Sequence, residues 1–344
     1  METRIVLPSE KNIEKCSQIL HAGGVVGMPT ETVYGLAANA LDGEAVLRIF
    51  SIKKRPADNP LIVHVPTIES AEELCYMNDT ARELMQAFCP GALTVLLPKR
   101  PIIPREVNAG LESVAIRIPS HPVALALLRA CNLPLAAPSA NKSGRPSPTS
   151  TGHVYEDLHG KIPFILEGGN CEVGLESTVI DLTTNVPTIL RPGGITPAML
   201  RGVGPEVHIA DSVNRALLAD ETAPSPGMRY RHYAPKGQIT LVRGEEDKVS
   251  RYCIARYEQA LEEKRSARIL AFNEHMPFYE GVDAVPIGKL AKPETIAQTL
   301  FDVLRQLDTD GKEEVFCEVL PPTGIGLAIM NRLQRAASFV LVDV

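Results

Sequence analysis

Apolar runs of strand length alternate with stretches of helical periodicity along the first 210 residues of the chain. The pattern begins with RIVL, continues with SEKNIEKCSQILHAGG and returns to the apolar VVGM, which predicts a strand, a helix and a strand. Ser9 can cap this helix, and Gly23 with Gly24 can end it. The same reasoning predicts strands at 61–65, 92–98, 114–118, 164–166 and 177–182, and helices near 42–52, 78–88 and 122–131. Residues 1–210 are therefore expected to form one α/β domain on a sizeable mixed sheet.

The periodicity fails between residues 211 and 236, where ETAPSPGMRYRHYAPK combines three prolines with a glycine. A linker is predicted there. After it, strand-like and helix-like segments alternate again, with helices near 246–265, 293–307 and 326–337. Because parallel strands need helical crossovers, residues 237–344 are predicted to form a smaller, Rossmann-like α/β domain with a parallel sheet.

The composition is that of an ordinary globular protein: 344 residues, 44% hydrophobic and 22% charged. A net charge of -6 argues against a protein that binds nucleic acid nonspecifically through many phosphate contacts. The seven cysteines are widely spaced, with none in a C-x-x-C pair, which is typical of buried reduced thiols. No leader-like segment and no apolar run of about 18 residues is present, so a cytoplasmic protein without a membrane partner is expected.

Two polar residues interrupt apolar strands. Arg117 lies within VAIRI and His64 within LIVHV. A buried guanidinium is costly unless it meets an anion, which an internal carboxylate or a substrate could supply. His64 likewise needs a partner, and a satisfied structural histidine is the commoner outcome at such a position.

Other polar clusters lie at predicted strand ends and loops, where open α/β sheets bind ligands. PTETVYG (29–35) is rich in hydroxyls, KKRPADNP (53–60) is rich in cations, and the loop from Pro138 to Thr149 suits phosphate binding by backbone N–H and serine groups. GLESTV and ILRPGG add Ser177 and Arg191 at the ends of a hairpin-like pair. Ordinary turns, solvated helix ends and loops would give each pattern separately. Together they supply cations and hydroxyls without a nucleophile–base pair or metal-ligand spacing, which favours positioning and charge neutralisation.

Six strings in unbroken order resemble the YrdC-type domain of L-threonylcarbamoyladenylate synthases: PTETVYGL, KKRPADNPLIVHV, VAIRIPSHP, APSANKSGRPSPT, GLESTVIDL and ILRPGGIT. SPGMRYRHYAP and PPTGIGLAIMNRL resemble the longer, two-domain form of the family. The resemblance implies an open twisted α/β sheet around a positively charged cavity. It also implies a reaction in which bicarbonate and L-threonine form an N-carboxy adduct that attacks the α-phosphate of ATP and expels pyrophosphate. Other proteins would then transfer threonylcarbamoyl to the adenosine beside the tRNA anticodon.

The resemblance also implies roles for individual residues. Lys53 and Arg55 match its K-x-R signature and are expected to be catalytic. The residues expected to bind ATP are Arg55, Asn59, Ser113, Ser139, Asn141, Ser147, Arg191 and Tyr233. The residues expected to bind threonine are Thr32, His64, Arg117 and Ser177. Arg117 is the natural partner of the amino acid carboxylate, since a guanidinium can hold a carboxylate bidentately.

In the linker, Arg229, Arg231 and Tyr233 look like a flap over the nucleotide. Mg²⁺ is expected with ATP rather than in a protein cage. The expected partners are ATP, L-threonine, bicarbonate and the downstream transfer proteins, with tRNA itself as a further candidate. Two rival functions remain open on the sequence: a carbamoyl-transferring maturation enzyme and a noncatalytic module that binds double-stranded RNA.

Overall fold

The structure is a computed structural model that describes residues 1–204, 206–213, 215 and 233–344. Contacts divide the chain into two compact units. The described part of unit 1 is 1–143, 147–204 and 206–213, and that of unit 2 is Gly144–Pro146, Arg215 and residues 233–344. Most of the predicted linker, including Arg229 and Arg231, lies outside the described residues.

Unit 1 is built on one 11-stranded mixed sheet. The strands, in spatial order, are β1 (Arg4–Val6), β8 (Phe164–Leu166), β2 (Val26–Met28), β3 (Gly35–Asn39), β7 (Leu135–Ala136), β4 (Ile62–His64), β6 (Ser113–Arg117), β5 (Leu93–Pro98), β9 (Thr178–Asp181), β10 (Thr188–Arg191) and β11 (His208–Ile209). β4 and β6 are parallel, whereas β5 runs antiparallel to β6 and parallel to β9. The predicted mixed sheet is therefore confirmed.

Several helices of unit 1 begin at a residue whose side chain caps them. Ser9 accepts a hydrogen bond from the Asn12 N–H at the start of α1, and Asp42 caps α2 in the same way. The helical elements of unit 1 are α1 (Glu10–His21), α2 (Gly43–Lys53), α3 (Ile68–Glu72), α4 (Asp79–Phe88), α5 (Arg105–Asn108), α6 (Pro122–Cys131), α7 (Thr151–Leu158), α8 (Pro197–Arg201) and the short η1 (Asp211–Val213).

The two faces of the sheet are covered differently. On one face, side chains from β4, β5 and β6 join residues of α2 and α4 in the main core, which includes Val63, Val95 and Ile116. On the other face α1 and α6 pack over the β2–β3–β7 end. Further along this second face, a small apolar cluster of strand residues contains no helix residue among those described: Ile62, Leu96, Ala115, Val179 and Leu190. These five side chains are buried and form an apolar floor on this face between the ends of the central strands, and Ala210 packs against them.

Strand β3 is among those that the sequence does not predict. Gly35–Asn39, which directly follows the loop of PTETVYG, forms β3 and pairs antiparallel with β2. GLAAN has little intrinsic β-propensity, so its strand geometry comes from pairing with β2 and β7 and from burial. The loop 29–34 is consequently held at both ends by strands.

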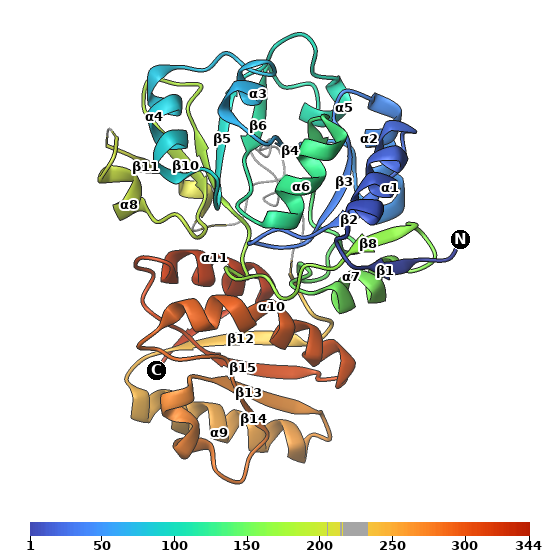
Figure 1. The fold of residues 1–344 in the computed structure, drawn as a ribbon. Coiled ribbons are helices and arrows are strands. Elements are labelled where there is room, and N and C mark those ends of the chain that lie inside the picture. Colours follow the sequence, from blue (N-terminus) through green and yellow to red (C-terminus); the bar gives the residue numbers. More distant parts are fainter. Residues whose placement is uncertain (205, 214, 216–232) are drawn as a thin grey trace. The chain divides into compact units, whose positions relative to one another are not determined.

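Unit 2 contains five strands that are all parallel, in the order β14–β13–β15–β12–β16. Their bounds are β12 (Gln238–Arg243), β13 (Ala267–Ala271), β14 (Ala284–Pro286), β15 (Glu314–Glu318) and β16 (Leu341–Asp343). The helical elements are α9 (Glu246–Glu262), η2 (Asn273–Tyr279), α10 (Pro293–Thr309) and α11 (Gly326–Ala336). Figure 1 shows α9 on one side of this sheet and α10 with α11 on the other. The predicted fold class, with a large mixed sheet followed by a smaller parallel one, is confirmed.

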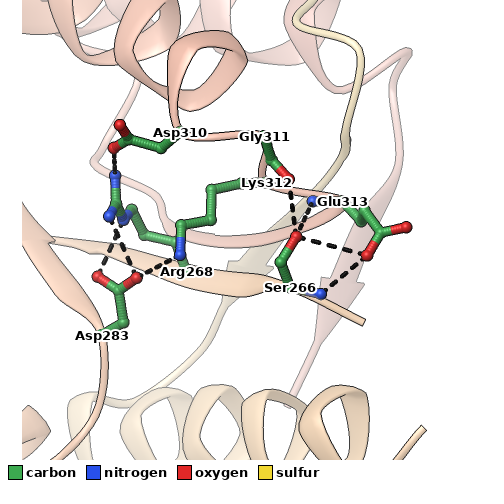
Figure 2. A network of polar contacts seen from close by, with 7 residues as sticks. All are labelled: Ser266, Arg268, Asp283, Asp310, Gly311, Lys312 and Glu313. Atoms are coloured by element: carbon green, nitrogen blue, oxygen red, sulfur yellow. Dashed lines mark hydrogen bonds and ion pairs between the residues drawn. The ribbon is translucent and has the colours of Figure 1, made fainter. Parts of the chain in front are cut away.

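A network of charged side chains links neighbouring segments of the second sheet (Figure 2). The guanidinium of Arg268 lies 2.9 and 3.1 Å from the two oxygens of Asp283, and it also pairs with Asp310. Lys312 Nζ lies 2.6 Å from Asp283 Oδ2. These contacts join the start of β13 to the segments that lead into β14 and β15.

Candidate active site

Arg117, the last residue of β6, forms a buried ion pair with Glu31. Its NH2 lies 2.6 Å from Glu31 Oε1, and the two side chains are only 4% and 6% exposed. NH1 donates to Thr32 Oγ1 at 2.7 Å, and Nε donates to the Gly91 carbonyl at 3.3 Å. The sequence predicted that Arg117 needs an anion but did not single out Glu31. The sequence does contain a clue to this partner: Glu31 is the only charged residue in PTETVYG, where it lies between Thr30 and Thr32.

Glu31 remains ionised in this setting. Burial alone would raise the pKa of its carboxyl, but the charge and hydrogen bond of Arg117 lower it below the ordinary value. The second oxygen, Oε2, is buried and has no hydrogen-bond partner among the described residues.

His64, the last residue of β4, lies directly opposite Arg117 in the parallel pair β4–β6. Register partners share a face of the sheet, so His64 and Arg117 project from the same side. His64 is 3% exposed, and its Nδ1 has no hydrogen-bond partner in the described part of the chain. Desolvation and the charge of Arg117 lower the pKa of His64 to about 3. The ring is therefore neutral near pH 7, and the commoner alternative of a fully satisfied structural histidine does not fit.

Ser177 joins the end of β10 to the middle of the sheet. Its hydroxyl lies 2.7 Å from Thr94 Oγ1 and accepts from Arg191 NH2 at 3.1 Å, while its carbonyl accepts from Arg191 Nε at 3.0 Å. Thr94 is in turn the register partner of Arg117. The turn after Arg191 passes so close that a Cβ on Gly193 would lie 2.3 Å from the Thr178 nitrogen, which explains the glycine. Ser177, Arg191 and Arg117 are thus brought to one edge of the sheet.

Lys53, at the end of α2, holds the loop that follows β7. The residue is 2% exposed, and its ammonium donates to the Asn141 carbonyl at 2.6 Å, to Asn141 Oδ1 at 3.2 Å and to the Ser139 carbonyl. Ser139 Oγ donates to Asn141 Oδ1 at 2.6 Å. The K-x-R and S-x-N segments are therefore joined by one network of hydrogen bonds.

Arg55 and Asn59 lie in the segment that leads into β4. Arg55 NH2 donates to the carbonyls of Asn59 and Pro60, both at 3.3 Å. The Asn59 side chain is completely buried, yet neither Oδ1 nor Nδ2 has a partner among the described residues. An amide whose donors and acceptor are all unpaired marks a place where a ligand can bind.

The residues expected to bind nucleotide and those expected to bind threonine lie mainly at opposite ends of the same strands. Ser113 begins β6 and Arg117 ends it, which separates them by roughly 13 Å at 3.3 Å per residue. Asn59 precedes β4 and His64 ends it. Ser147 bridges toward the Arg117 edge, since its hydroxyl donates to Glu176 Oε1 at 2.5 Å. The site therefore extends across the face that carries the apolar floor.

Tyr233 belongs to unit 2 in the described structure. It is 4% exposed, and its ring stacks on Phe301 of α10 with centroids 5.1 Å apart. Its expected contact with the nucleotide stays a prediction.

The described residues contain no group of three or more His, Cys, Asp or Glu side chains that could hold a metal ion. The thiols nearest this site are poor nucleophiles, because burial raises the pKa of Cys171 to about 12 and that of Cys89 to about 11. Within the described part of the chain, no helix is both long and apolar enough to cross a membrane.

Two known protein families match the chain, one over each half. Residues 18–193 match the family described as "Telomere recombination", and residues 195–338 match "Threonylcarbamoyl-AMP synthase, C-terminal domain". The chain belongs to the threonylcarbamoyl-AMP synthase family. The predicted family and its two-domain form are confirmed.

Full-length relatives agree with this assignment. The chain is 42% identical to the threonylcarbamoyl-AMP synthase of Pyrococcus abyssi, covering 97% of this chain and 96% of the relative. It is 43% identical to the enzyme of the same name from Bacillus subtilis, covering 96% and 94%. Among solved structures, P. abyssi Sua5 complexed with L-threonine superposes with a TM-score of 0.93, at 41% identity and full coverage of both chains.

Proposed function

We propose that this chain makes threonylcarbamoyl-AMP from L-threonine, bicarbonate and ATP, as its membership of the synthase family implies. The amine of threonine forms a bond to the carbon of bicarbonate with loss of water, which gives N-carboxythreonine. A carboxylate oxygen of this adduct then attacks the α-phosphorus of ATP, and pyrophosphate leaves. The observation that carries the proposal is the buried group of Arg117, Thr32 and His64 at one end of the strands whose other end carries Arg55 and Asn59.

Threonine is proposed to bind at the Arg117 edge. Arg117 retains N–H groups beyond the three that are already bonded, since a guanidinium has five, and these can hold the amino acid carboxylate. The neutral His64 offers an uncharged nitrogen to the threonine hydroxyl. Thr32 and Ser177 complete the polar lining of this end.

ATP is proposed to bind along the rest of the face. Arg55 and Arg191 supply positive charge for the phosphates, and the unpaired amide of Asn59 supplies a donor and an acceptor. Lys53 holds Ser139 and Asn141 in place, and Ser113 with Ser147 adds hydroxyls at the two ends. Preorganised cations stabilise the charge that develops on the phosphates during attack, which suits a site without a covalent nucleophile. Mg²⁺ would enter with ATP as part of the substrate.

The wider biological role also remains a proposal. The product is an activated acyl group, so a separate protein must transfer it to the adenosine next to the tRNA anticodon. On the same grounds we propose that the protein is cytoplasmic and that Tyr233 contacts the nucleotide. We also propose domain limits of 1–210 and 237–344, with a linker at 211–236.

The test is release of pyrophosphate by the purified full-length protein. Release should require L-threonine and bicarbonate together with ATP and Mg²⁺. L-Serine should be used about 10–200-fold less efficiently, because one missing methyl contact is worth about 1–3 kcal/mol. Equal release without threonine would contradict the proposal, and RNA affinity that ignores ATP would favour the rival RNA-binding module.

A further inference from the structure

The strongest unexplained feature of the candidate active site is the second carboxylate oxygen of Glu31. Oε1 is bound by Arg117, but Oε2 is buried without a hydrogen-bond partner among the described residues. A buried acceptor that has lost water without gaining a donor is unfavourable, so such groups usually serve a ligand. The backbone N–H groups of Glu31 and Ser120 also help to lower the pKa of this carboxyl, but no hydrogen bond to Oε2 forms among the described residues, so this oxygen can accept a donor that arrives with a ligand.

The position of Glu31 restricts which donor this is. Its carboxylate is bonded to the same guanidinium that we assign to the carboxylate of threonine. In an α-amino acid the ammonium and the carboxylate are separated by one carbon atom, so a ligand held by Arg117 carries its ammonium next to that guanidinium. Glu31 is the anion at this place: the other groups bonded to Arg117 are the hydroxyl of Thr32 and the carbonyl of Gly91.

We propose that Glu31 is the receptor for the α-ammonium group of the amino acid substrate. This inference rests on the proposed function, because it assumes that Arg117 binds the threonine carboxylate. Arg117 and Glu31 then form a pair with no net charge, which suits a zwitterion: the guanidinium meets the substrate carboxylate and the Glu31 carboxylate meets the substrate ammonium. The cations Arg55 and Arg191, in contrast, are assigned to the polyanionic nucleotide.

The ionisation of the neighbouring groups agrees with a receptor role. Arg117 keeps the pKa of Glu31 low despite burial, so the carboxylate is charged when the substrate arrives and is a weak proton acceptor. Glu31 is therefore assigned to binding and orientation of the amine rather than to its deprotonation. The uncharged His64 across the strand pair does not compete with the ammonium for Glu31.

The first arm of the test uses the unmodified full-length protein and three small ligands, measured by calorimetry without ATP or bicarbonate. The ligands are L-threonine, 3-hydroxybutanoate, which lacks the ammonium, and L-threoninol, which lacks the carboxylate. We expect 3-hydroxybutanoate to bind about 10–100-fold more weakly than threonine. Equal affinity for both would mean that no receptor for the ammonium exists, which overturns the proposal without any variant.

The second arm uses Glu31→Gln, with the exposed Glu83→Gln as a matched control. Glu31→Gln should lose about 10–100-fold in affinity for threonine but bind 3-hydroxybutanoate as the unmodified protein does. Equal losses for both ligands would indicate that Glu31 only supports Arg117, and no loss would also overturn the proposal. Glu31→Asp keeps the charge and should restore part of the preference for threonine. Thermal unfolding of each variant checks that the fold is intact.

The outcome separates this proposal from the proposed function. If the protein discriminates threonine through Glu31 but releases no pyrophosphate, the synthase assignment fails and the receptor stands. If it releases pyrophosphate but Glu31→Gln keeps the full preference for threonine, the receptor fails and the synthase stands. If the unmodified protein does not bind threonine, both fail.

Discussion

Lys53 Nζ lies 2.6 Å from the carbonyl oxygen of Asn141, and this contact joins the end of α2 to a loop 88 residues further along the chain. The same ammonium also reaches Asn141 Oδ1 and the Ser139 carbonyl. A single buried cation therefore fixes the backbone and side chain of the loop that carries two of the proposed nucleotide contacts. Lys53 therefore fixes the conformation of this loop in addition to contributing positive charge to the site.

Replacement of Lys53 by methionine should therefore destabilise the fold as well as abolish activity. The variant keeps most of the side-chain volume but leaves buried carbonyl groups without their charged donor, for which we expect a loss of about 2–4 kcal/mol in the free energy of unfolding. Denaturant unfolding measures this loss. The neighbouring Lys54→Met, at an exposed position, should change stability by less than about 0.5 kcal/mol. Equal effects of the two substitutions would contradict the role given to Lys53.

Arg55→Ala and Arg117→Ala should both remove most activity, but for different reasons. Loss of Arg55 should weaken nucleotide binding, and loss of Arg117 should weaken threonine binding, each by about 2–5 kcal/mol. Arg117→Ala should also lower the free energy of unfolding by about 3–5 kcal/mol, because it leaves the Glu31 carboxylate buried without its cation. Calorimetry with each ligand separates the two effects. Normal threonine binding by Arg117→Ala would show that the carboxylate is bound elsewhere.

The sequence predicts the order of most strands and helices because their apolar periodicities are strong, as in LIVHV and ALTVLLP. It also indicates that Arg117 and His64 need partners, since both interrupt apolar strands. It does not predict Glu31 as a partner of Arg117. That pairing spans 86 residues and depends on the course of the loop 29–34 above the sheet, which no local pattern specifies. Strand β3 is missed for a similar reason, because GLAAN becomes a strand only through its neighbours.

The network around Asp283 should make the stability of unit 2 depend on pH. Partial burial would raise the pKa of Asp283, but Arg268 and Lys312 lower it below the ordinary value of 3.8. A carboxyl whose pKa is lower in the folded state contributes stability above its unfolded pKa and loses it as the pH falls through the folded value. Asp283→Asn should therefore cost about 1–2 kcal/mol near pH 7, and the difference should shrink as the pH falls below 3.8 and through the lower pKa of the folded state.

The control for this network is Asp247→Asn, which removes an exposed helical ion pair with Arg251. That substitution should cost at most about 0.5 kcal/mol at any pH. Urea unfolding of unit 2, followed between pH 2 and pH 8, distinguishes the two variants. A constant difference between Asp283→Asn and the unmodified protein over this range would mean that the charge of Asp283 is not what stabilises the unit.

His64 should make unit 1 sensitive to mild acid. Desolvation and Arg117 lower its pKa from 6.5 to about 3, so between these values the unfolded chain binds a proton that the folded chain excludes. Stability must then fall as the pH decreases from about 6.5 toward 3, with a slope of up to about 1.4 kcal/mol per pH unit from this one residue.

His64→Gln removes the titrating group, so the unfolding free energy of this variant should vary less steeply with pH over that range, whatever the substitution costs at pH 7. His208→Gln, on the exposed strand β11, controls for removal of a surface histidine. The ring-proton NMR signals of His64 should correspondingly show no inflection between pH 5 and pH 8. An inflection near pH 6.5, or a slope unchanged by His64→Gln, would mean that the imidazole can become charged and that the threonine end of the site is not the neutral pocket inferred from its contacts.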